Sequence, residues 1–496
     1  MLSTSSALFV LTNCIGRGTH HDTAFATKNP AYTSISEVEE STSQPPGVLR
    51  TTGSISNHVP DMFGLPLTAG LHRDSDIELE RDQAWPSAFE TLAPQASYDG
   101  CTELRSPKIS RPREAFLVKY YAETWGPIFD CLDPDQTFSS TVVQLALDSS
   151  PPLLWAIFAT SAMQLSRVPS SSFADAQYYR AQCSKSLLPI LLRSAELSTN
   201  EDTLFATYVL LRNYDHMTGN MMEKDSDSIF TSALAIAVEP SLKINNLDLG
   251  RASFWVHLRQ DLHLALLLQV PVKTDYPPCL QREKMLEHIE LLMNGQLQAD
   301  QASINCAWAQ RVVILLLDVI NYCFQKGSRN LHTWLHLGNQ LDHWRFAKPV
   351  LFNPYYERKA DLSQGRIFPE VWIASNCYVL AWMYYYTAAI LLKMFPPWNE
   401  ADSAPGSSHG DIECQEEVRV LARMICGIAK TNPNAQALIV LCHMVTVSAI
   451  FFTHGQERAE TLNLIRMART VTGHPLREVE RKLCNGWAMT DENHPG

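Results

Sequence analysis

Arginine, glutamine and aspartate stand side by side at positions 259–261, inside the otherwise apolar stretch FWVHLRQDLHLALLLQ that begins at Phe254. Charged side chains on a buried helix must find partners, because unpaired burial costs on the order of several kcal/mol. We therefore expect Arg259, Gln260 and Asp261 to form a buried polar network that fixes helix packing. Phe254 and Trp255 should anchor the same packing. The alternative is that this group binds an effector.

Histidines provide the best metal-binding pattern in the chain. His332 and His336 stand four residues apart, and His343 lies two turns further along. Imidazoles at positions i and i+4 of a helix can share a zinc ion, but a catalytic site also needs a third ligand and a general base. Since the sequence contains no H-E-x-x-H, we expect these histidines to lie at an interface or in the core, and we assign no metal ligand.

Two short patterns suggest catalysis only formally. Gly406-Ser-Ser-His-Gly410 matches G-x-S-x-G, but a nucleophile elbow needs a preceding strand, and the polar residues 401–405 come before it. Asp130-Cys-Leu-Asp-Pro-Asp135 and Asp225-Ser-Asp227 are the nearest approach to the magnesium-binding carboxylates of terpene cyclases. Neither carries the aspartate-rich motif with a second Asn/Ser/Glu box, so both are interpreted as turn or cap clusters. We therefore predict no enzyme activity, no catalytic residue and no cofactor.

Cysteine spacing limits both zinc binding and disulfide formation. No two cysteines are closer than Cys414 and Cys426, and no C-x-x-C occurs. Several lie in apolar helical contexts, which is typical of free buried thiols and of a reducing intracellular compartment. The twelve cysteines stand at positions 14, 101, 131, 183, 279, 306, 323, 377, 414, 426, 442 and 484.

The charge balance disfavours direct binding to nucleic acid. The 496-residue chain has a formal net charge of −12 and 46% hydrophobic residues. Non-specific DNA affinity comes from Lys and Arg displacing counterions, so an acidic chain is a poor match for phosphate. The modest basic patches are residues 281–284 and 108–113 (KISRPR). The second is either a nuclear-import element or solvated surface.

Residues 1–110 are predicted to form a disordered tail rich in Ser, Thr and Pro. They carry 13 acidic and 7 basic residues and few sustained apolar patterns. The conformational entropy lost on ordering them would therefore not be offset by apolar burial. Within this tail, Asp74–Phe89 alternates acidic residues with Ile77, Leu79 and Trp85. That composition suits either a solvated linker or a segment that folds onto a coactivator.

From residue 111 to 490 the apolar spacing predicts one all-α domain, with a flexible loop at 401–410. Pro151-Pro152 should separate the two helices of a hairpin, and Thr199–Asp202 resembles a capping box before a helix at 203–217. No run of alternating β-branched residues predicts a sheet. Further helices are expected at about 251–270, 303–325, 331–347, 368–394, 411–430, 434–453, 456–472 and 475–487.

Two stretches without charge are long enough to be considered as membrane spans. Val371–Leu392 and Ala435–Phe452 contain no Asp, Glu, Lys or Arg. The first places Tyr384, Tyr385 and Tyr386 in mid-span, whereas lipid-spanning helices concentrate aromatic residues at their ends. We therefore expect buried core helices and no association with a membrane.

Several ordered blocks resemble the fungal-specific transcription factor domain, the helical region of zinc binuclear cluster regulators. The resemblance covers roughly residues 113–490, most of the chain. Its blocks are FLVKYYAETWGPIFDCLDPDQTF and VVQLALDSSPPLLWAIFATSAMQLSR between Phe116 and Arg167, TLFATYVLLRNYDHM from Thr203, FWVHLRQDLHLALLLQVP from Phe254, FPEVWIASNCYVLAWMYYYTAAILL from Phe368 and VRVLARMICGIAKTNPNAQALIVLC from Val418.

The resemblance implies a nuclear regulator of transcription, including regulators of secondary-metabolite clusters. The DNA-binding module of such regulators needs six cysteines within about thirty residues, which this chain does not have. We therefore expect it to reach DNA only indirectly, through other transcription regulators or coactivators, or to act as a truncated form. Homodimers, heterodimers and a small-molecule effector all stay open. The alternative class is a helical enzyme or small-molecule-binding protein unrelated to transcription.

Overall fold

The computed structural model describes residues 109, 111–167, 173–192, 194–219, 247–272, 281–327, 329–397 and 408–493. All of them belong to the larger of two compact units, the one that includes residues 102–496. The predicted disordered tail, apart from its residue 109, lies outside the described residues. So do Asp225–Asp227 and residues 401–407 of the predicted loop.

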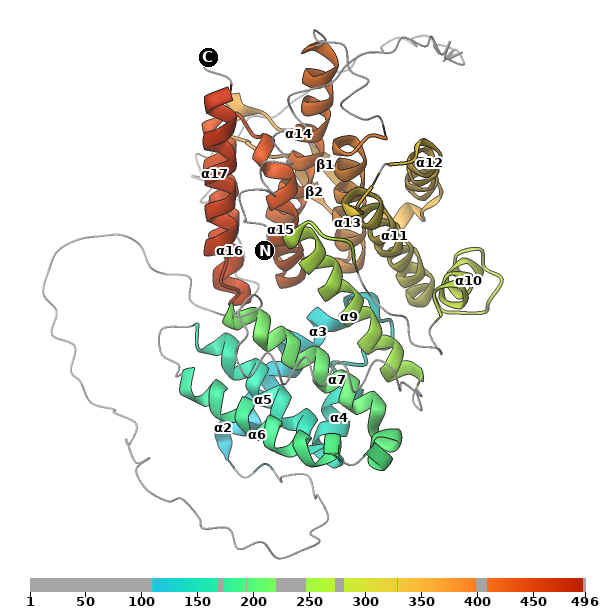
Figure 1. Ribbon diagram of the computed structural model, residues 1–496, viewed down its shortest axis with the longest axis vertical. Helices are drawn as coiled ribbons and strands as arrows, with labels where there is room; N and C mark the ends of the chain where they lie inside the picture. Colours follow the sequence, from blue (N-terminus) through green and yellow to red (C-terminus); the bar gives the residue numbers. More distant parts are fainter. Residues whose placement is uncertain are drawn as a thin grey trace, which may run out of the picture. The chain divides into compact units, whose positions relative to one another are not determined.

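The described residues form a mostly helical fold, as the sequence predicts (Figure 1). The elements are α2 (Pro112–Tyr120), η1 (Tyr121–Trp125), α3 (Gly126–Phe129), η2 (Asp130–Leu132), α4 (Thr141–Asp148), α5 (Pro151–Leu165), α6 (Phe173–Leu192), α7 (Ser194–Thr218), α9 (Leu247–Leu268), α10 (Arg282–Met293), α11 (Gln301–Phe324), α12 (Leu331–Ala347), η5 (Val350–Phe352), β1 (Tyr356–Arg358), η6 (Leu362–Gln364), β2 (Glu370–Trp372), α13 (Asn376–Met394), α14 (Ser408–Thr431), α15 (Ala435–Ser448), η8 (Ala449–Phe451), α16 (Gly455–Thr472) and α17 (Arg477–Asn493).

Helix α5 is the centre of the N-terminal group of helices. It packs against α2, α4, α6 and α7, and nearly every side chain from Pro151 to Gln164 is buried. Proline suits the first turn of a helix because its missing N–H would have no partner there. Pro151 and Pro152 therefore end the α4–α5 connection and start α5, which confirms the predicted hairpin.

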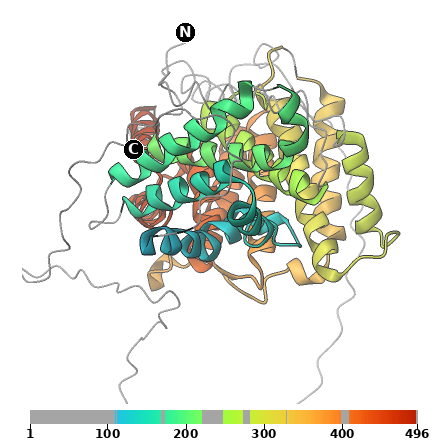
Figure 2. The same cartoon turned by 90° about the horizontal axis from the view of Figure 1, so that it is seen from below.

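Helix α9 joins this group to the C-terminal helices. It contacts α7 on one side and α11 and α15 on the other, while α13 packs against α11, α14 and α15 (Figure 2). The buried apolar side chains of both groups form one continuous core. A charged side chain on the buried part of α9, such as Arg259, therefore lies among helices of both groups and must be satisfied by them.

Two predicted helix starts are wrong. Helix α7 begins at Ser194 rather than after Thr199–Asp202, because the Ala-Glu-Leu run at 195–197 favours helix and the helix continues through the polar residues. Helix α13 begins at Asn376 rather than at 368. Residues 370–372 instead form β2, which pairs antiparallel with β1 in the register Tyr356↔Trp372.

Side chains at the end of α14 hold β2 in its extended form. Thr431 Oγ1 accepts a hydrogen bond from Val371 N at 3.2 Å, and Asn432 Nδ2 donates to Val371 O at 2.8 Å. Asn432 Oδ1 also accepts from Ile373 N at 3.3 Å. These bonds satisfy backbone groups that a short two-stranded sheet leaves open.

Both charge-free stretches lie within this core. Residues 371–392 run from β2 into α13, and 435–451 form α15 and η8, with Phe452 directly after them. Among the described helices, α11 is long and apolar enough to cross a membrane, with a mean hydropathy of 1.5 over 18 residues, 78% of them buried in the fold. Such burial is typical of the core helix of a folded domain.

Candidate functional site

The Arg259 side chain lies against the end of α3. Its guanidinium donates to Phe129 O at 2.8 Å and Ile128 O at 3.4 Å, and it also contacts Cys131 Sγ. The side chain is only 7% exposed. Carbonyls at the C-terminus of a helix lack partners within the helix and carry partial negative charge, so they suit a buried cation.

Asp261, one turn after His257 on the same helix, connects α9 to α7 instead. Asp261 accepts from Arg212 of α7 at 2.5 Å and lies 3.4 Å from His257 Nε2. Arg212 also lies 2.9 Å from His257 Nδ1, and Gln260 Nε2 donates to Val209 O at 3.0 Å. The predicted polar network is therefore confirmed, and its members hold α9 against two different elements.

The two predicted anchors are also confirmed. Phe254 is fully buried and Trp255 is 3% exposed. Both belong to the continuous apolar core of the fold. The polar network is thus surrounded by apolar side chains, which strengthens its hydrogen bonds and makes an unpaired member costly.

A cluster of histidines, which the sequence did not reveal, lies near this network, with His263 and His474 buried and His443 half-buried. The rings of His263 and His443 stack with centroids 4.5 Å apart, and His263 Nε2 lies 3.3 Å from Tyr384 OH. Burial lowers the pKa of His443 to about 3 and the pKa of His474 to about 4. Burial likewise lowers the pKa of His257 to about 4. The folded protein therefore holds these rings neutral at physiological pH.

The histidine pattern at 332–343 forms no metal site with other described residues. His332, His336 and His343 are exposed on α12, and His336 lies 2.9 Å from Gln340. Among the described residues, no group of three or more His, Cys, Asp or Glu side chains could hold a metal ion. Of the two expected locations, the core is wrong, because the buried face of α12 is formed by Leu337, Leu341 and Trp344. A location at an interface stays a prediction.

The aspartates near 130 close a turn, as predicted. Asp130 accepts hydrogen bonds from the backbone N–H of Phe138 at 2.7 Å and of Ser139 at 2.8 Å, and Asp133 accepts from Thr137 N at 2.8 Å. Burial raises the pKa of Asp130 to about 6. Ser408, the central serine of the G-x-S-x-G pattern, is the first residue of α14.

The described cysteines are all free, and most are buried, as their apolar contexts predict. Burial raises the pKa of Cys131 to about 11 and that of Cys183 to about 12. Thiols with such raised pKa values hold little thiolate and react slowly.

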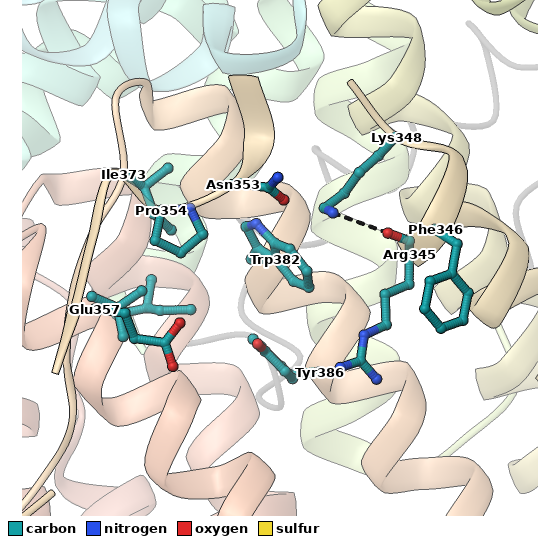
Figure 3. A pocket seen from close by; sticks show the side chains of 11 residues that line it. Arg345, Phe346, Lys348, Asn353, Pro354, Glu357, Ile373, Trp382 and Tyr386 are labelled. Carbon is teal, nitrogen blue, oxygen red and sulfur yellow. Dashed lines mark hydrogen bonds between the residues drawn. The ribbon is translucent and has the colours of Figure 1, made fainter. Parts of the chain in front are cut away.

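A surface pocket of about 490 Å³ lies where α12, the β1–β2 hairpin and α13 meet (Figure 3). Trp382 and Tyr386 of α13 form its floor, their rings stacked with centroids 5.4 Å apart. Lys348 lies over Trp382, with Nζ 4.8 Å from the ring centroid. The residues that line the pocket are Arg345, Phe346, Lys348, Asn353, Pro354, Glu357, Val371, Ile373, Trp382, Tyr386 and Ile428.

Sequence reasoning missed this pocket because its lining comes from segments that are up to eighty residues apart. In comparisons with known proteins, no protein-family model, no curated protein and no solved structure matches the chain. The site is therefore interpreted from its own residues.

Proposed function

We propose that this protein is a nuclear regulator of transcription of the fungal zinc-cluster type that acts by contact with other proteins. It catalyses no reaction and reaches DNA through a partner. The resemblance of the ordered sequence blocks between residues 113 and 490 supports this class. A pathway-specific role, such as control of a secondary-metabolite cluster, fits the same class.

The observation that carries the proposal is how the chain uses the Arg259-Gln260-Asp261 block. All three side chains bind other helices of the fold, at Phe129, Val209 and Arg212. Titratable groups poised for catalysis are normally directed into a cleft that a substrate can enter. Here the most prominent charged block stabilises helix packing, which suits a scaffold that presents surfaces to partners.

The charge of the chain supports the indirect route to DNA. A net charge of −12 gives the protein little electrostatic attraction to phosphate. On this proposal, the protein is recruited by a chain that itself reads the DNA sequence. Other regulators or coactivators, in a homomeric or heteromeric assembly, are the partners of this proposal.

The test is to tag the protein in its native cell and to delete its gene in a parallel strain. We expect the tagged protein to concentrate in nuclei and the deletion to alter a discrete set of transcripts. A tagged protein confined to the cytosol, together with unchanged transcripts, would contradict the proposal. Conversion of a substrate by the purified protein would point to the alternative class, a helical enzyme.

A further inference from the structure

Exposed apolar side chains are concentrated on one segment. Of the seventeen large apolar side chains that the described part of the chain exposes, nine lie between Leu331 and Trp372. Phe346 is 80% exposed and Val350 is 81% exposed. Isolated apolar residues on a surface are normal, but a concentration of them marks an interaction site. This segment borders the pocket between α12, the hairpin and α13.

The pocket brings apolar and cationic groups together. Phe346, Lys348 and the ring of Trp382 line it, and Figure 3 shows Arg345 and Lys348 on the side opposite Glu357. Lys348 Nζ donates to Arg345 O at 2.9 Å, so its bonded partner is a neutral carbonyl. In the described residues, neither Arg345 nor Lys348 forms an ion pair with a carboxylate. Burial and the nearby Arg345 lower the pKa of Lys348, as expected for a cation without a counter-charge.

The charge of the pocket lining favours an acidic partner. The lining carries two cations, Arg345 and Lys348, and one anion, Glu357, on a chain whose net charge is −12. Carboxylates of an acidic partner would pair with the two cations.

We propose that the pocket and its exposed apolar border bind an acidic peptide segment that carries an aromatic side chain and belongs to a partner protein. The aromatic ring packs into the pocket against Phe346 and Tyr386, while the acidic side chains meet Arg345 and Lys348. Val350 and Leu351 lie in the chain between two residues of the pocket lining and extend the apolar contact beyond it. The inference rests on the proposed regulatory function and specifies the chemistry of its partner.

The test measures fluorescence anisotropy of a labelled synthetic peptide, in which Asp and Glu flank one Trp and one Phe, against the purified full-length chain. We expect saturable binding that Arg345→Glu with Lys348→Glu weakens at least about tenfold. The matched control is Lys119→Glu with Lys185→Glu, which makes the same charge change at exposed positions elsewhere and should leave the affinity within about twofold. Circular dichroism confirms that each variant keeps its helices.

Four outcomes would overturn the inference. Equal weakening by the control variant, or equal binding of a peptide whose Trp and Phe are replaced by Ala, would reduce the interaction to general charge attraction. Displacement of the peptide by stoichiometric indole-3-acetate would make the pocket a small-molecule site. Self-association that Arg345→Glu with Lys348→Glu abolishes, measured by sedimentation, would assign the surface to a second copy. Because binding is measured on the purified chain, these outcomes are independent of nuclear location and transcript changes.

Discussion

At the scale of single residues, Arg259 illustrates how a charge can be buried without a carboxylate. Its guanidinium group donates hydrogen bonds to the carbonyls of Ile128 and Phe129, about 130 residues earlier in the chain. A buried polar group contributes little net stability when it is paired, but its partners are costly to leave unsatisfied. The main effect of the network is therefore to fix which helices pack together. Its net contribution to the free energy of unfolding is smaller.

The first prediction concerns this arginine. Arg259→Met keeps the apolar stem but leaves two buried carbonyls without a donor, so the free energy of unfolding should fall by about 2–4 kcal/mol. Arg251→Met, on the same helix but with its ion pair to Asp248 at the surface, should change it by less than about 1 kcal/mol. Urea unfolding followed by circular dichroism measures both. Equal effects of the two substitutions would show that the network does not fix the packing.

The second prediction follows from the buried histidines. The pKa of His443 falls from 6.5 in the unfolded chain to about 3 in the folded protein. Between these values the unfolded chain binds more protons, so stability falls as the pH drops below 6.5 and is unaffected above it. Each such histidine should cost about 2 kcal/mol between pH 7 and pH 5. Asp130, whose pKa is raised to about 6, opposes this trend.

Replacing one histidine isolates its share of this pH dependence. His443→Leu removes one titrating ring, so its stability should drop by about 2 kcal/mol less than that of the wild type between pH 7 and pH 5. Urea unfolding at both pH values measures the difference. An identical drop in the two proteins would mean that His443 is protonated in the folded state as readily as in the unfolded chain.

At the scale of elements, the contact between α14 and the segment that leads into β2 decides where the hairpin lies. Gly427 of α14 packs directly against Pro369, so that a Cβ built on Gly427 would lie 2.8 Å from Pro369 Cγ and closer still to Pro369 O. This close approach lets Thr431 and Asn432 bind β2 one turn further along. A small residue on α14 therefore positions one wall of the pocket.

The third prediction compares two helical glycines. Gly427→Ala should lower the free energy of unfolding by about 1–3 kcal/mol, because the added methyl group collides with the Pro369 backbone. Gly338→Ala on α12, where nothing lies within 4 Å of the added carbon, should raise it by about 0.5–1 kcal/mol. Thermal unfolding of both variants measures the sign of each change in stability. Stabilisation by Gly427→Ala would contradict this packing.

The helices could largely be predicted from the sequence, whereas the elements against which each one packs could not. The bounds of α12 agree with the prediction because Leu337, Leu341 and Trp344 repeat at helical spacing. Helix α10 was missed, since the charged residues at its start suggested a surface patch. The hairpin was missed because β2 is held by side chains of α14 some sixty residues later, a contact that local patterns do not contain.

The same limit applies to the candidate sites. The polar character of Arg259-Gln260-Asp261 in an apolar helix predicted a buried network correctly, because burial requires pairing wherever the partners lie. The histidine cluster and the pocket could not be predicted, since His263 meets His443 across 180 residues of sequence. Only the three-dimensional fold brings such residues together.

At the scale of the whole molecule, the described residues form a helical body that combines a polar network between its helices with a cationic, apolar surface. Its net charge of −12 gives little electrostatic attraction to DNA, while Arg345 and Lys348 are the cations with which the proposed acidic partner would pair. The proposed function therefore depends on contact with other regulators. On the proposed function, the chain that brings it to DNA is a zinc-cluster regulator.

Chromatin occupancy of the tagged protein tests this claim most directly. The zinc-cluster regulators that co-purify with it are deleted one at a time, and its occupancy is measured by chromatin immunoprecipitation in each strain. We predict discrete occupied sites that lose at least about nine-tenths of their signal when one partner is deleted, while the abundance of the tagged protein stays unchanged. Occupancy that persists in every deletion strain, or sequence-specific binding of DNA by the purified chain alone, would contradict the account.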